Sequence, residues 1–175
     1  GNLVKRTVDM SCKYFDGVVQ EPSAPEALDC GLKKAVKDAI ASVCENMDSL
    51  HVADASEAVF SIFRRANKYI DETTPWILAK DENRRVRLGT VLYNLLETIR
   101  IGAVLLAPFM PETSDRILKQ LSAEDQSLDF GVLKPGTALG KAEVLFARID
   151  EKELMEQIES ERKKAEREKS SAEKP

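Results

Sequence analysis

The stretch DENRRVRLGTVLYNLLETIRIGAVLL, residues 81–106, decides the fold class of this chain. Apolar residues recur in it at three-and-four spacing, which predicts one long α-helix. Asp81 is a suitable N-cap at its start, and Pro108 lies just beyond its end. The face that we expect to be buried comprises Val86, Val91, Leu92, Leu95, Leu96, Ile99, Ala103 and Leu106.

Four further helices are predicted around this one. A first amphipathic helix starts at Asn2 and ends at the stop signal Asp16-Gly17. The others span about 25–47, 52–72 and 111–121, each with an apolar stripe of helical period or a proline suited to its first turn. Five helices with short connections predict an all-α, antiparallel helix bundle.

The last fifty residues differ from the rest. Glycine and proline punctuate residues 122–149, where residues 144–146 are suited to a short extended piece. Residues 151–175 are almost all charged or small, which predicts a charged C-terminal helix or tail that buries no core. We therefore expect two parts, 1–150 and 151–175. Because the chain begins inside a helical pattern without methionine, we also expect it to be a piece of a longer protein.

Composition narrows the function classes. With 26 basic and 30 acidic residues the net charge is −4, so any binding of RNA requires a local basic patch. Three scattered cysteines and one histidine predict no zinc site and free, mostly buried thiols, as in a reducing cytosol. No apolar run approaches the roughly 20 residues of a membrane span, so we expect a soluble, cytoplasmic protein. No catalytic constellation is present, and the carboxylates lie on helix faces typical of solvated surfaces.

Trp76 is the main candidate for binding. It is the only tryptophan, it follows Pro75 between two helices, and basic residues come after it. An aromatic ring beside positive charges can stack on an unpaired base while the charges contact the RNA backbone. A tryptophan in this place can equally be a plug that closes the end of a bundle. The candidate contacts to the RNA backbone are Lys80, Arg84, Arg85 and Arg87.

Asn2 and Arg6 form a second candidate. They lie one helical turn apart on the polar face of the first helix, where an amide and a guanidinium could together contact the edge of one base. An ordinary solvated face has the same pattern. Spacing alone does not separate the two interpretations.

Several blocks resemble the anticodon-binding domain of methionyl-tRNA synthetases. Around the tryptophan these are ANKYIDETTPW at 66–76 and AKD at 79–81. Elsewhere they are GNLVKRT at 1–7, KYFDG at 13–17, LLAPFMPET at 105–113 and LFARID at 145–150. The resemblance implies a helix bundle that reads the CAU anticodon of methionine tRNA, with Asn2, Arg6 and Trp76 contacting anticodon bases.

The resemblance also implies a larger enzyme, methionine–tRNA ligase. Its ATP-binding signature loops belong to a separate N-terminal catalytic domain, which uses methionine, ATP with Mg²⁺ and tRNA. No cofactor or catalytic residue is therefore expected in this chain. Residues 139–150 would pack on that domain and would be loosely held without it. In many bacterial members a charged linker leads on to a dimer-forming, tRNA-binding domain.

Two alternatives remain at this point. A helical protein–protein scaffold would explain the acidic composition and the apolar stripes. The anticodon module of a sibling class I synthetase would share the bundle.

Overall fold

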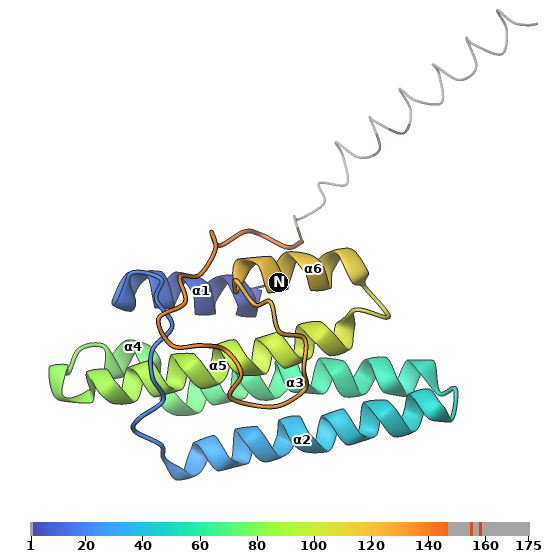
Figure 1. Cartoon of the computed structure of the whole chain (residues 1–175), viewed down its shortest axis with the longest axis horizontal. Coiled ribbons are helices and arrows are strands. Elements are labelled where there is room, and N and C mark those ends of the chain that lie inside the picture. The colour runs from blue at the N-terminus through green and yellow to red at the C-terminus, as the bar shows by residue number, and fades with distance from the viewer. Residues whose placement is uncertain (1, 147–154, 156–157, 159–175) are drawn as a thin grey trace, which may run out of the picture. The chain divides into compact units, whose positions relative to one another are not determined.

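A computed structural model describes residues 2–146, 155 and 158 of the chain. Its described part is all-α, as predicted (Figure 1). The only β-type pairing in that part is an isolated bridge between Val18 and Ala138. The elements are α1 Asn2–Phe15, α2 Ala27–Asp48, α3 Val52–Thr73, α4 Pro75–Leu78, the 3-10 helix η1 Glu82–Arg84, α5 Arg85–Leu106 and α6 Pro111–Gln120.

Helix α5 is the centre of this arrangement. In Figure 1, α1 and α6 lie on one side of α5, and α2 and α3 lie on the other. The helical stretch from Glu82 to Leu106 is long and apolar enough to cross a membrane, but 94% of its apolar 18-residue window is buried inside the protein. Its apolar character therefore belongs to a core helix that is covered from several directions. One predicted core residue is wrong: Val86, in the first turn of α5, is 58% exposed.

The helix ends follow local signals. Gly17 adopts a left-handed φ of 73° after α1, and its N–H donates to the Ser11 carbonyl at 3.1 Å. This conformation costs a glycine little, so the predicted stop at Asp16-Gly17 is confirmed. Asp81 accepts a hydrogen bond from the Asn83 N–H and caps η1, which leads directly into α5.

A buried ion pair on α5 anchors part of the segment that follows α6. Glu97 and Arg100 are almost fully buried and pair at 2.9 Å. The Glu97 carboxylate accepts the N–H groups of Gly131 and Leu133. The Arg100 guanidinium donates to the carbonyls of Asp125, Ser127 and Asp129. The expectation that carboxylates lie on solvated faces is wrong here, because this one replaces water with a complete set of partners.

Residues 139–145 are attached to α6. Arg116 donates to the carbonyls of Val144 and Leu145, at 2.9 and 3.0 Å. The Gly140 N–H donates to the Gln120 carbonyl at 2.9 Å. Directed hydrogen bonds thus join the described part of this segment to α6, and residues 144–146 form no strand.

Residues 2–145 belong to one compact unit. The predicted boundary at 150–151 and the predicted charged tail lie outside the described residues, apart from Met155 and Ile158. The thiols differ from the prediction: Cys12, Cys30 and Cys44 are all exposed, because they lie on the outward faces of α1 and α2.

Candidate nucleic-acid interface

Trp76 lies on a short helix between α3 and α5. Thr74 precedes it in the left-handed region, with φ 41° and ψ 61°, and this turn separates α3 from α4. The proline occupies the first position of α4 and is buried, whereas Trp76 is 40% exposed. Ile77 beside it is 55% exposed. The tryptophan is therefore not a sealed plug, and part of its ring is open to solvent.

The other two candidates, Asn2 and Arg6, lie on α1. Asn2 is exposed and Arg6 is half-buried. Among the described residues neither side chain forms a hydrogen bond or an ion pair, whereas their neighbour Lys5 pairs with Asp9. Within the described chain, no such bond joins them to residues 74–84, the connector between α3 and α5 that carries Trp76. Both side chains thus have polar groups open to a ligand.

The C-terminal end of α1 contacts the start of α5. The Arg85 guanidinium donates to the Tyr14 carbonyl at 2.9 Å and lies over the Phe15 ring, 4.9 Å from its centroid. Arg85 therefore already has two partners in the folded chain. Its role as a contact to the RNA backbone stays a prediction, and it would compete with this attachment.

The other basic residues near the tryptophan differ in availability. Lys80 is exposed, and Arg84 is exposed but pairs with Glu26 at 3.0 Å. Ion pairs at such exposure are weak, about 0–1 kcal/mol, so a phosphate can replace the carboxylate of Glu26. On α3, Arg64 pairs with Glu57 and Arg65 with Glu72. The basic patch is thus largely balanced by carboxylates.

The prediction for Arg87 is corrected by the structure. Its side chain is only 4% exposed, and its Nη1 and Nη2 donate to the Asp29 carboxylate at 2.6 and 2.7 Å. It also donates to the Ala24 carbonyl. A guanidinium held in this way cannot reach an RNA phosphate without breaking a buried ion pair. Arg87 is therefore part of the core.

The buried pair belongs to a larger network. The Tyr69 hydroxyl on α3 donates to Asp29 at 2.6 Å, and the Asn94 amide on α5 donates to that hydroxyl at 3.3 Å. Burial alone would raise the pKa of Asp29, but the hydrogen bonds from Arg87 and Tyr69 outweigh it and lower that pKa. Burial, followed by the hydrogen bond to Asp29, raises the pKa of the Tyr69 phenol. The network is ionised at Asp29 and protonated at Tyr69 near neutral pH.

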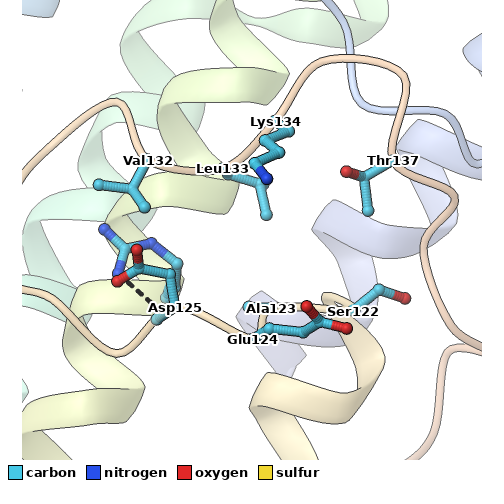
Figure 2. A pocket seen from close by; sticks show the side chains of 9 residues that line it. Ser122, Ala123, Glu124, Asp125, Val132, Leu133, Lys134 and Thr137 are labelled. Carbon is cyan, nitrogen blue, oxygen red and sulfur yellow. Dashed lines mark hydrogen bonds between the residues drawn. The ribbon is translucent and has the colours of Figure 1, made fainter.

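Two hollows accompany these features. The larger, about 530 Å³, has Ser122, Ala123, Glu124 and Asp125 on one side and Val132, Leu133, Lys134 and Thr137 on the other (Figure 2). Arg100 also lines it, but its guanidinium is occupied by Glu97 and three carbonyls. The smaller, about 430 Å³, lies where α1 and the following loop meet the start of α5. Among the described residues that line them, no hydrogen bond joins a serine or threonine hydroxyl to a carboxylate or an amine.

These features define a class of protein: an all-α module whose surface carries exposed aromatic and polar side chains that can bind a ligand. The sequence matches the family described as "Anticodon binding domain of methionyl tRNA ligase" over residues 19–166. Trp76 lies inside that range, whereas Asn2 and Arg6 lie before it.

Curated relatives and solved structures are consistent with this family match. The methionine–tRNA ligase of Caldanaerobacter subterraneus subsp. tengcongensis is 50% identical over 160 residues, which are 88% of this chain and 25% of that protein. The ligase of Clostridium tetani is 46% identical over 164 residues, 91% of this chain and 26% of that protein. The apo methionyl-tRNA synthetase of Mycobacterium tuberculosis matches with a TM-score of 0.78 and 34% identity, over 86% of this chain and 32% of that chain.

The chain belongs to the family of anticodon-binding domains of methionyl-tRNA ligases. It spans about a quarter of the length of the curated relatives that it matches.

Proposed function

We propose that this chain binds the anticodon loop of methionine tRNA as part of a methionine–tRNA ligase. The observation that supports this most is the exposed indole of Trp76 on a short helix inside the region of family similarity. Stacking of a base on such a ring contributes about 1–3 kcal/mol. The stack works for any base, so Trp76 supplies affinity more than discrimination.

Discrimination is assigned to Asn2 and Arg6. An asparagine amide both donates and accepts, and a guanidinium only donates, so together they can match one pattern of base-edge groups. A base with the wrong pattern leaves desolvated donors without partners, which costs about 1–3 kcal/mol per group. The favoured loop sequence is CAU. The phosphate contacts are assigned to Lys80 and Arg84, which are exposed, and secondarily to Arg85.

The chemistry of the ligase is assigned elsewhere. Attachment of methionine, with ATP and Mg²⁺, belongs to a catalytic domain outside this chain, and no residue here is assigned to those groups. The solved relative in complex with methionyl-adenylate, from Mycobacterium tuberculosis, is 35% identical with a TM-score of 0.75, over 85% of this chain and 30% of that chain. The further partners are that catalytic domain and, through an additional domain, a second subunit. The proposed location is the cytoplasm.

The test measures binding of a synthetic anticodon stem-loop with the sequence CAU to the 175-residue chain. Trp76→Ala should weaken binding about 5- to 150-fold, the equivalent of 1–3 kcal/mol. Ile77→Ala is the matched control, because it removes an exposed apolar side chain from the same helix without removing a stacking ring. Trp76→Phe should retain part of the affinity.

A second pair of variants tests discrimination. Arg6→Ala should reduce the preference for CAU over stem-loops with single-base changes, while Lys5→Ala on the same helix should not. Equal binding by wild type and Trp76→Ala would refute the proposal. A preference for the anticodon of another amino acid would instead assign the chain to a sibling synthetase.

A further inference from the structure

We propose that the buried network of Asp29, Tyr69 and Arg87 positions Trp76, by fixing both ends of the connector that carries it. This inference rests on the proposed function, in which Trp76 stacks on an RNA base. Tyr69 and Arg87 are positioning residues, because neither is exposed to a ligand. They act through the backbone of residues 74–84.

The network holds each end of this connector. On the α3 side, the Thr73 hydroxyl donates to the Tyr69 carbonyl at 2.6 Å, and the Thr74 N–H donates to Ile70. Tyr69 thus belongs to the last turn before the left-handed residue that starts the connector. On the α5 side, Arg87 lies in the first turn after it. Both residues bind the same carboxylate, that of Asp29 on α2.

The Asp29 carboxylate uses all of its acceptor sites. It accepts two hydrogen bonds from Arg87, one from the Tyr69 hydroxyl and one from the Glu26 N–H. A carboxylate offers about four such sites. Because every site is used in a fixed direction, a shift of α3 against α5 must break at least one bond. The spacing of the helix ends that flank Trp76 is therefore set to within a hydrogen-bond length.

A second set of contacts, nearer the surface, also joins the start of α2 to the connector and to α5. Glu26 binds Arg84, the last residue of η1, at 3.0 Å, and approaches Arg87 Nε at 3.3 Å. The Ala24 N–H donates to Thr90 at 3.0 Å. Residues 24–29 thus join the connector and α5 from outside.

The composition of the network fits positioning better than stability alone. Well-packed apolar side chains often replace a buried ion pair without loss of stability. The Asn94 Oδ1 atom is buried without a partner among the described residues, which is a cost that an apolar core would avoid. What a polar network adds is direction, because hydrogen bonds from the surrounding residues, together with packing, hold a binding group in its productive geometry.

The experiment uses the fact that Trp76 is the only tryptophan of the chain, so its fluorescence reports on one place. Tyr69→Phe removes the hydroxyl that joins α3 to the carboxylate and keeps the ring. Tyr93→Phe is the matched control: it removes a buried tyrosine hydroxyl from α5 that donates to the Leu133 carbonyl at 2.9 Å, outside the network. Acrylamide quenching and affinity for the CAU stem-loop are measured for both, with helix content by circular dichroism.

Tyr69→Phe should change Trp76 quenching and weaken stem-loop binding about tenfold, while Tyr93→Phe stays within twofold of wild type in both. The double variant Asp29→Leu/Arg87→Met separates the positioning of Trp76 from folding stability, because it removes the directed bonds and puts apolar side chains in their place. It should remain folded, with altered quenching and weaker binding.

Equal quenching and equal affinity for Tyr69→Phe, the double variant and Tyr93→Phe would overturn the inference. The quenching arm needs no RNA. If Trp76→Ala binds the stem-loop as well as wild type does, the proposed function fails, and the comparison of quenching still decides whether the network positions Trp76.

Discussion

Replacing Asp29 by asparagine tests the buried network through folding stability. The side chain keeps its shape, but one acceptor oxygen becomes an NH₂ group that faces N–H or O–H donors. More importantly, the guanidinium of Arg87 loses its buried counter-charge. Removing one partner of a buried ion pair typically costs about 3–5 kcal/mol. The carboxylate of Glu26, at 3.3 Å from Arg87 Nε, compensates for part of this loss. We therefore expect Asp29→Asn to lower the free energy of unfolding by about 3 kcal/mol.

That loss is large beside the roughly 5–15 kcal/mol of a whole domain. At about 2–4 °C per kcal/mol for a chain of this size, it lowers the melting temperature by about 6–12 °C. The assay is thermal and urea unfolding, followed by circular dichroism at neutral pH. Asp38→Asn is the matched control, because Asp38 lies on the same helix and pairs with Lys34 at the surface. That change should cost at most about 0.5 kcal/mol.

Acid adds an independent check. Since the pKa of Asp29 is lower in the folded chain than in the unfolded chain, its contribution is present above the unfolded value and is lost as the pH falls through the folded value. The wild type should therefore lose more stability than Asp29→Asn below about pH 4. Equal losses for Asp29→Asn and Asp38→Asn at neutral pH would refute this account of the core.

Burial, and then the charge of the nearby Glu97, raises the pKa of Tyr93 to about 12, so its contribution to stability is present below pH 10 and is lost above it. Urea unfolding at pH 9, 10 and 11 should show a smaller alkaline loss for Tyr93→Phe, by up to about 1.4 kcal/mol per pH unit. Gly140→Ala would place a methyl group 2.8 Å from the Lys119 carbonyl, a backbone atom, and should destabilise by about 1–3 kcal/mol in the same assay. Gly31 lies inside α2, and a methyl group there would meet only the end of the Arg65 side chain at 3.6 Å, so Gly31→Ala should stabilise by about 0.5–1 kcal/mol. Stem-loop binding measured against salt should give a log–log slope near −1.4 if Lys80 and Arg84 each neutralise one phosphate, and Lys80→Gln should reduce it by about 0.7.

The helix boundaries could be predicted because their causes are local. Gly17 tolerates a positive φ, Asp81 caps η1, and Pro111 starts α6, so each signal lies within a few residues of the boundary that it sets. The stripes of α1 and α3 follow from burial on one side. These arguments need no knowledge of which helices touch.

The polar interior could not be predicted in the same way. Arg87 and Asp29 are 58 positions apart, and nothing near either residue indicates the other. Charge normally predicts exposure, which is why Arg87 was assigned to the surface. One signal was available: Glu97 and Arg100 stand three residues apart inside an almost wholly apolar run, a spacing that allows an ion pair within a buried helix.

The candidate site could be predicted from the sequence only in part. Tryptophan after proline suits a plug and a stacking surface equally, and only the packing around α4 decides how much of the ring stays exposed. For Asn2 and Arg6, periodicity gave the polar face correctly, but an RNA contact on that face stays a prediction.

The three carbonyls that Arg100 binds belong to residues 125, 127 and 129, a step of two at each interval. A side chain at a fixed place on α5 thereby sets the length of a segment that has no helix or strand of its own. Inserting one residue inside 125–129 would move at least one carbonyl out of reach and leave a buried N–H without an acceptor. In natural variants of this domain, changes in loop length are expected before or after those five positions, while the five themselves keep their number.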